Sequence, residues 1–466
     1  MRTFSILLIS LLSSINLLAQ DITGQWNGVL KVQGTQLRLV FNVTKTDKGV
    51  SSTMDSPDQG AKGIPTTTTS FENSILTITI ENARIVYVGA LGKDNIIVGT
   101  FKQAGQSFAM NLSKEVIEKE KLVRPQEPIK PYPYYSEDVT FENSIASINL
   151  SGTLTLPKKD GVFPVAILIS GSGPQNRDEE LLGHKPFLVL SDYLTKNGIA
   201  VLRYDDRGTG LSQGDFKTAT SADFATDVES AIEYLKTRKE INKKKIGLIG
   251  HSEGGLIAPM VASKSKDVAF IVLLAGTGIQ GDQILLLQQK LIGKASGVSE
   301  EDLQKTELTN RKAFEIVNKS NSMEQLNIDL TNFIKQSLVD NPNAGKPQGM
   351  SDDDFVKLQV KQIANPWMQY FIKYNPRPAL EKVKCPVLAI NGEKDLQVPP
   401  KENLEAIKNA LEKAGNKKVT IKELPNLNHL FQECKTGSPD EYATIEQTFS
   451  PTALTEILKW VQTQTK

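Results

Sequence analysis

The sequence predicts two domains: a small antiparallel β domain, followed by an α/β domain whose sheet is mostly parallel. A chain of 466 residues is too long for one ordinary domain. Short runs of alternating apolar and polar residues fill residues 21–115, which is typical of half-exposed antiparallel strands. From residue 136 onward, near-continuous apolar runs alternate with amphipathic stretches. Strands that are apolar on both faces indicate a parallel sheet covered by helices on both sides.

The charges of the chain are nearly balanced, with 54 lysines and arginines against 53 aspartates and glutamates. Such a chain has no strong field to attract nucleic acid or an anionic membrane, so we expect neither as its main partner. No histidine or cysteine cluster has the spacing of a zinc site. We therefore expect no metal and no organic cofactor, and nothing in the sequence favours a particular oligomeric state.

The first twenty residues have the layout of a secretory signal peptide. Arg2 precedes the apolar run FSILLISLLSSINLL, and a polar stretch begins at Asp21. The apolar run is too short and too rich in serine to favour a membrane span. We expect cleavage near Ala19 or Gln20, export to the periplasm or the extracellular space, and a mature protein without a membrane span.

Prolines separate the two predicted domains. The stretch VRPQEPIKPYPYY contains four prolines, which forbid a regular helix and favour an extended linker over residues 116–135. In the preceding β domain, we expect Trp26 to be a core aromatic residue. The second domain then covers residues 136–466. Within it, about residues 279–377 have helical character and no strand signal, which is too long for an ordinary connection and predicts a helical cap.

A serine between two glycines is the first candidate for chemistry. The apolar run 246–249 leads into Gly250-His251-Ser252-Glu253-Gly254. An ordinary turn at the end of a strand is one interpretation. The other is a nucleophile elbow, a strained strand-to-helix turn in which only a very small residue fits two positions before and after the serine. The elbow interpretation predicts Ser252 as a nucleophile, provided that the rest of the chain supplies its partners.

A serine hydroxyl needs a base to take its proton, and the base needs an acid to orient it. The chain has three histidines. We expect His251 to be a packing residue, because its place in the elbow points it away from the serine. His184 lies in a polar loop well before the elbow, and we expect a surface or loop residue there. His429 follows the last predicted strand and is the expected base.

Asp395 is the expected acid. It stands three residues after Gly392, at the carboxyl end of an apolar run, and Val398-Pro399 close the loop that contains it. Glu393 is the competing carboxylate. Its spacing from the end of the predicted strand is less favourable, so we choose Asp395.

Two backbone N–H groups are expected to bind the oxyanion. One belongs to Glu253, directly after the nucleophile, and the other to Ser172 in the run ILISGSGPQ. Gly171 and Gly173 are alternatives to Ser172, because a backbone donor is not recognisable from residue identity. The run RYDDRGTGLS, residues 203–212, predicts a tight glycine turn. A phosphate-binding loop is the alternative, but the run lacks the lysine and the following helix that such a loop requires.

As a set, GSGPQNRDE, LRYDDRGTGLS, GHSEGG, NGEKDLQVP and NLNHLF resemble the motifs of serine hydrolases of the α/β-hydrolase superfamily, in the expected order. The order Ser252, Asp395, His429 is also that of the superfamily. The resemblance covers residues 136–466 and is closest to exported bacterial carboxylesterases of the serine aminopeptidase-like branch that carry an N-terminal β domain. It implies an α/β-hydrolase fold, with an eight-stranded, mostly parallel sheet and a helical cap, and a catalytic triad of these three residues.

The predicted activity is the hydrolysis of small-molecule carboxylic esters with short to medium acyl chains. In the cap, Leu286, Trp367 and Phe371 are expected to wall the substrate pocket, and apolar walls favour an acyl chain. No basic clamp for a phosphorylated carrier stands out, nor an acidic anchor for the amino end of a peptide. The alternatives on the same triad are an aminopeptidase or acyl-peptide hydrolase and a thioesterase. A binding protein without catalysis is a further alternative.

Overall fold

The computed structural model describes most of the chain, and it divides the chain into two compact units that are treated separately below. The first unit comprises residues 1–120 and 347–350, and the second comprises residues 121–346 and 351–466. The predicted signal peptide and residues 119–123 of the predicted linker lie outside the described residues. The described residues are 21–32, 35–47, 49–103, 106–118, 124–341, 346 and 350–466.

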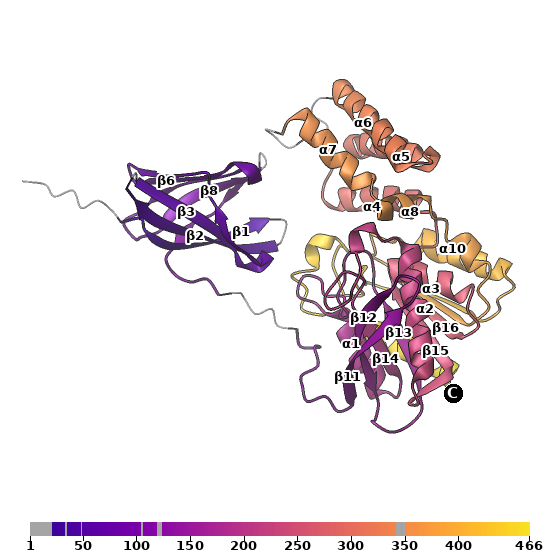
Figure 1. Cartoon of the computed structure of the whole chain (residues 1–466). Helices are drawn as coiled ribbons and strands as arrows, with labels where there is room; N and C mark the ends of the chain where they lie inside the picture. Colours follow the sequence, from indigo (N-terminus) through magenta and orange to yellow (C-terminus); the bar gives the residue numbers. More distant parts are fainter. Residues whose placement is uncertain are drawn as a thin grey trace, which may run out of the picture. The chain divides into compact units, whose positions relative to one another are not determined.

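The first unit is a curled antiparallel sheet (Figure 1). Its strands are β1 (Gly24–Val32), β2 (Thr35–Thr46), β3 (Gly49–Ser56), β4 (Ala61–Pro65), β5 (Thr68–Glu72), β6 (Ile75–Ile80), β7 (Ile85–Leu91), β8 (Ile97–Gln103), β9 (Gln106–Ala109) and β10 (Leu112–Ser113). They lie in the order β4-β3-β2-β1-β10-β8-β7-β6-β5, and β9 pairs with β8. Trp26, Phe41, Tyr87 and Phe101 are buried in its core, so Trp26 is the core aromatic residue that the sequence predicts.

The second unit contains an eight-stranded sheet. Its strands are β11 (Tyr135–Asn143), β12 (Ile148–Leu156), β13 (Phe163–Ile169), β14 (Ala200–Tyr204), β15 (Ile241–His251), β16 (Val268–Leu274), β17 (Val387–Gly392) and β18 (Val419–Leu424). They lie in the order β11-β12-β14-β13-β15-β16-β17-β18. β12 is antiparallel to β11 and to β14, and the remaining pairs are parallel. This order confirms the predicted fold class.

Helices cover both faces of this sheet. The helices of the second unit are α1 (Pro186–Lys196), α2 (Ser221–Thr237), α3 (Glu253–Ala262), α4 (Gly281–Ala295), α5 (Glu300–Lys319), α6 (Met323–Asp340), α7 (Asp352–Ile363), α8 (Pro366–Lys373), α9 (Arg377–Leu380), α10 (Pro400–Lys413) and α11 (Pro451–Thr465). The apolar sides of α2, α3 and α10 pack on one face, and those of α1 and α11 pack on the other. Two hydrophobic clusters result, because the central strands are apolar on both sides.

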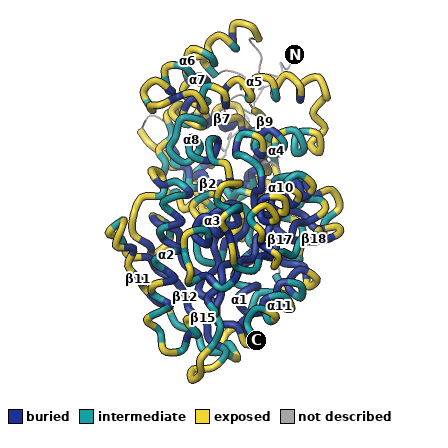
Figure 2. Tube along the Cα trace, turned by 90° about the vertical axis from the view of Figure 1, so that its right-hand side faces the viewer, coloured by how far each residue is buried: buried dark blue, intermediate teal, exposed yellow. Residues whose placement is uncertain are grey.

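Helices α4 to α8 form the cap, inserted between β16 and β17 (Figure 1). The outer helices α5–α7 are amphipathic, and much of their surface is exposed (Figure 2). On α6, for example, Leu326, Leu330, Ile334 and Leu338 are buried at intervals of four residues, which is one helical stripe. In the described part of the chain, no helix is long and apolar enough to cross a bilayer.

Residues 124–135 of the predicted linker belong to the second unit, whereas residues 116–118 belong to the first. The guanidinium of Arg124 donates to the carbonyl oxygens of Ile445, at 2.9 Å, and of Ala443, at 3.1 Å. The side chain of Gln126 accepts from the N–H of Thr448 at 2.6 Å. These bonds fix residues 124–126 on the loop that precedes α11.

Candidate active site

A strained turn joins β15 to α3 at Ser252. Its φ of 53° and ψ of −114° are outside the regions that residues with a side chain ordinarily adopt. A methyl group on Gly250 would lie 2.0 Å from the carbonyl oxygen of Gly254, and one on Gly254 would lie 2.1 Å from that of Ile169. Glycine is therefore required at both places. The geometry is that of a nucleophile elbow, and it leaves Ser252 partly exposed.

Asp395 and His429 meet at the carboxyl end of the sheet. Nδ1 of His429 lies 2.8 Å from Oδ2 of Asp395, and the residues are only 4% and 2% exposed. The other oxygen of Asp395 accepts from the backbone N–H groups of Gln397 and Val398, each at 2.8 Å. Because the carboxylate holds the hydrogen of Nδ1, Nε2 is left as the basic atom. The competing Glu393 is exposed, and its Oε2 accepts from the N–H of Asn426 at 2.9 Å.

The elbow and the loop of His429 are neighbours. Nε2 of His251 lies 2.9 Å from the carbonyl oxygen of His429, and the two imidazole rings are 4.8 Å apart between centroids. Ser252 follows His251 directly, so the hydroxyl and the predicted base belong to one small region. Among the described residues, the Ser252 hydroxyl forms no hydrogen bond with the His429 ring. In structures without substrate, the distance between a nucleophile and its base is often longer than a hydrogen bond.

The loop after β13, residues 170–180, is called the oxyanion loop below, after the oxyanion donor that the sequence predicts in it. A methyl group on Gly171 would lie 3.2 Å from Cβ of Ser252, so this loop borders the nucleophile. The N–H of Gly171 donates to Oε1 of Glu179 at 2.7 Å and is therefore occupied. By contrast, the N–H groups of Ser172, Gly173 and Glu253 have no protein partner among the described residues. The structure therefore argues against Gly171 as a donor and leaves Ser172, its alternative Gly173 and Glu253 free to donate.

Two aspartates that the sequence analysis did not single out hold the oxyanion loop. Asp206 follows β14 and is buried; it accepts from Oγ of Ser170 at 2.7 Å and from the N–H of Gln175 at 3.0 Å. Burial raises the pKa of Asp206, against the effect of these two bonds. Its neighbour Asp205 accepts from Arg177 at 3.1 and 2.8 Å. In the sequence, this role is indicated only by the pair of aspartates directly after a buried strand.

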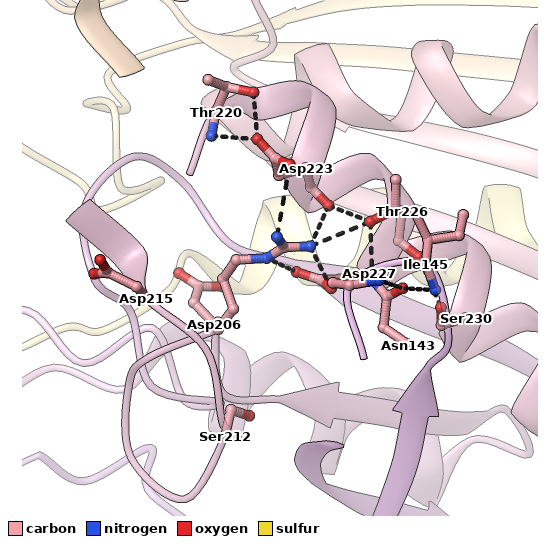
Figure 3. A network of polar contacts seen from close by, with 12 residues as sticks. Asn143, Ile145, Asp206, Ser212, Asp215, Thr220, Asp223, Thr226, Asp227 and Ser230 are labelled. Carbon is pink, nitrogen blue, oxygen red and sulfur yellow. Dashed lines mark hydrogen bonds and ion pairs between the residues drawn. The ribbon is translucent and has the colours of Figure 1, made fainter. Parts of the chain in front are cut away.

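The loop after β14 is itself anchored to α2. Nε and Nη2 of Arg207 lie 2.8 Å from the two carboxylate oxygens of Asp227, and Nη2 also donates to the carbonyl oxygen of Asp223. Nδ2 of Asn143 adds a bond of 2.7 Å to Asp227. Figure 3 shows Asp223, Thr226 and Asp227 around the guanidinium and Asn143 beside Asp227. The arginine of this run thus serves an internal ion pair, which agrees with the predicted tight turn rather than with a phosphate-binding loop.

The cap contacts the elbow through a hydrogen bond. The indole Nε1 of Trp367, on α8, donates to Oε1 of Glu253 at 2.8 Å, and Oγ of Ser221 donates to the same oxygen at 2.6 Å. Burial raises the pKa of Glu253, and the two hydrogen bonds oppose this shift. The ring of Phe371 stacks on Trp367 with centroids 5.1 Å apart. Leu286, the third predicted wall residue, is buried on α4.

His184 lies in a loop, which is one of the two predicted places for it, but it is buried rather than at the surface. It is 1% exposed; Nδ1 is 3.0 Å from Oγ1 of Thr448 and Nε2 is 2.9 Å from the carbonyl oxygen of Tyr442. The polar composition of its own loop could not reveal that a segment near the C-terminus covers it. Burial lowers the pKa of His184, which favours the neutral ring.

The strand order and the elbow together define an α/β hydrolase. A family model agrees with this class, since the model for the X-Pro dipeptidyl-peptidase (S15 family) matches residues 130–424, more than half of the chain. The chain therefore belongs to the X-Pro dipeptidyl-peptidase S15 family.

Individual proteins are also similar. The esterase EstD of Thermotoga maritima is 28% identical over 308 residues, which are 64% of this chain and 62% of that esterase. The chain thus spans less than two thirds of that relative. An acyl transferase of Shewanella hanedai is 32% identical over 123 residues, 26% of this chain and 37% of the transferase. Among solved structures, an esterase of Pyrococcus furiosus has a TM-score of 0.43 and 18% identity, and the match covers 75% of this chain and 100% of that one.

Proposed function

We propose that this protein is a serine hydrolase that cleaves carboxylic esters of short to medium acyl chains. The observation that carries the proposal is the strained elbow at Ser252 beside the buried pair of His429 and Asp395. The name of the Thermotoga maritima relative, an esterase, supports the choice of ester. Fold alone would not support it, because the same fold serves many reactions.

The reaction proceeds through an acyl-enzyme. Oγ of Ser252 attacks the acyl carbonyl while Nε2 of His429 takes its proton, and Asp395 stabilises the imidazolium that forms. The N–H groups of Ser172 and Glu253 donate to the oxyanion of the tetrahedral intermediate. His429 then gives the proton to the leaving alcohol. In the second half, water gives a proton to His429 and attacks the acyl-enzyme, and Ser252 regains its proton as the acid leaves.

The acyl chain is proposed to lie against Leu286, Trp367 and Phe371 of the cap. Each methylene that becomes buried there adds about 0.8 kcal/mol of binding until the pocket is full. We therefore expect kcat/KM to rise along an acyl series and then to fall. The rise requires apolar side chains along the acyl chain. Trp367 supports this proposal, because its indole forms a hydrogen bond with Glu253, the residue after the nucleophile.

A peptidase is the second candidate, because the family to which the chain belongs is named after an X-Pro dipeptidyl-peptidase. The two candidates share the nucleophile and differ in the leaving group, which is an alcohol in one and an amine in the other. A thioesterase differs from both in its thiol leaving group. A panel of matched ester, thioester and amide substrates therefore separates them.

The test measures kcat/KM for p-nitrophenyl esters of increasing acyl length, for a thioester, and for aminoacyl and X-Pro amides. A fluorophosphonate probe reports on the nucleophile separately. We expect the esters to be cleaved fastest, the probe to label the protein, and Ser252→Ala to abolish both signals. Ser263→Ala, at the end of the same helix, is the matched control and should leave both unchanged. Faster cleavage of the amides would establish the peptidase instead, and a protein that the probe does not label is no serine hydrolase.

A further inference from the structure

A second histidine–carboxylate pair lies beside the pair of His429 and Asp395. Oε1 of Glu179 is 2.9 Å from Nδ1 of His251 and accepts from the N–H of Gly171 at 2.7 Å. Nε2 of His251 is 2.9 Å from the carbonyl oxygen of His429. Both side chains are buried. The pair thus connects three segments that meet at the nucleophile: the oxyanion loop, the elbow and the loop of the predicted base.

The partners of His251 define its protonation state. A carbonyl oxygen only accepts hydrogen bonds, so Nε2 must carry a hydrogen. Nδ1 faces an oxygen of Glu179, which as an ionised carboxylate only accepts hydrogen bonds, so Nδ1 carries a hydrogen as well. A ring with two N–H groups is an imidazolium, and the charge of Glu179 balances it. Burial would lower the pKa of His251, but the charge and hydrogen bond of Glu179, the bond to His429 and the charge of Asp395 outweigh it and raise the pKa.

We propose that the ion pair of Glu179 and His251 positions the oxyanion loop and the catalytic base, and that the enzyme turns over only while His251 is protonated. The proposal rests on the serine hydrolase function proposed above. Loss of the proton leaves one ring nitrogen as an acceptor facing another acceptor, either the carboxylate or the carbonyl oxygen. One of the two loops must then move away from the elbow. His251 and Glu179 are positioning residues, because neither is placed to touch the substrate.

The titratable groups that face His251 come from three loops. They are Glu179 of the oxyanion loop, His429 after β18 and, further away, Asp395 after β17. His184 provides a natural contrast, because it is also buried and also meets a backbone carbonyl oxygen. Its Nδ1, however, meets the hydroxyl of Thr448, which can donate or accept, and its Nε2 also lies 3.1 Å from Nε2 of Gln432, so the hydrogen-bond partners of this ring carry no charge. The carboxylate is the difference between the two sites.

The first test is the pH profile of ester hydrolysis in the full-length protein. In Glu179→Gln, the amide oxygen can still accept from Gly171, but the negative charge is gone. We expect kcat to fall roughly 10- to 100-fold at neutral pH, below the effect of deleting an oxyanion donor, with KM nearly unchanged. The loss of kcat at alkaline pH should also begin at lower pH than in the wild type. His184→Gln is the matched control and should keep the wild-type profile. An unshifted profile in Glu179→Gln overturns the proposal.

The second test does not depend on activity. The chain has three histidines, so ¹⁵N-histidine NMR of the wild type can follow each ring. We expect two protonated ring nitrogens on His251 at neutral pH, and one on His184. A neutral His251 in the wild type overturns the proposal even if Glu179→Gln fails to fold. A charged His251 in a protein that neither hydrolyses esters nor reacts with the fluorophosphonate rejects the proposed function instead, and the positioning role with it.

The sign of the stability effect follows from the raised pKa of His251. The pair contributes its full stability below the ordinary histidine pKa of about 6.5, and the contribution is lost as the pH rises through the folded-state pKa. In wild type, the unfolding midpoint should therefore fall over the same alkaline range as kcat. An unfolding midpoint in Glu179→Gln that depends on pH as in wild type contradicts the ion pair.

Discussion

The oxyanion loop and the cap both contact the elbow, yet different forces hold them. Buried carboxylates tie the loop: Asp205 holds Arg177, Asp206 holds Ser170 and Gln175, and Glu179 holds Gly171. The outer cap helices instead bury single apolar stripes and expose the rest of their surface (Figure 2). A loop held by buried carboxyl groups cannot shift without leaving a buried polar group without its partners, whereas apolar packing tolerates change. We infer that the loop side sets the chemistry and that the cap sets the choice of substrate.

The strongest test of this division is Asp395→Asn. An asparagine can donate to Nδ1 of His429 and thereby fix the wrong tautomer, so we expect kcat to fall by about 10⁴. Glu393→Gln removes a nearby carboxylate that faces Asn426 and should leave kcat within about twofold. Steady-state kinetics on one ester checks both variants. Equal losses in the two would mean that the acid is not Asp395.

The next test compares an ion pair of the body with one of the cap. In Arg207→Met, Asp227 keeps a buried charge without its main partner, so the free energy of unfolding should fall by about 3–5 kcal/mol. On α5, Arg311→Met removes an exposed pair with Glu307 and should cost at most about 1 kcal/mol. Urea titrations measure both. A cap variant as damaging as the body variant would break the comparison.

The sequence predicted those features that depend on local pattern. Glycines at fixed spacing around Ser252, apolar runs and chain order were enough for the fold class and for a candidate triad. Apart from the pair of Asp395 and His429, the polar contacts between distant segments were missed, because no local pattern encodes them. Glu179 and His251 are 72 residues apart, and Glu253 and Trp367 are 114 apart. The sequence analysis predicts that His251 is a packing residue and that Glu253 contributes only its backbone N–H. In the structure, however, each side chain has a hydrogen-bonded partner.

The smallest expected effect belongs to Trp367→Phe, which sharpens the role assigned to the cap. Phenylalanine retains the apolar ring and its stacking with Phe371 but removes the hydrogen bond to Glu253. The net cost to stability should be about 1 kcal/mol. Because α8 is then less tightly held at the elbow, we expect the optimum of the acyl series to broaden or move by one or two carbons, with kcat for the best ester within about threefold.

The matched control for that variant is Trp460→Phe on α11, whose indole donates to Oγ1 of Thr420 at 3.1 Å. It removes a hydrogen bond of the same kind at a place that does not border Ser252, so it should lower stability similarly and leave the acyl preference unchanged. The measurement is kcat/KM along the acyl series for both variants. If Trp367→Phe lowers kcat equally for every chain length, the indole acts on the chemistry through Glu253, and the cap shares the role that we assign to the oxyanion loop.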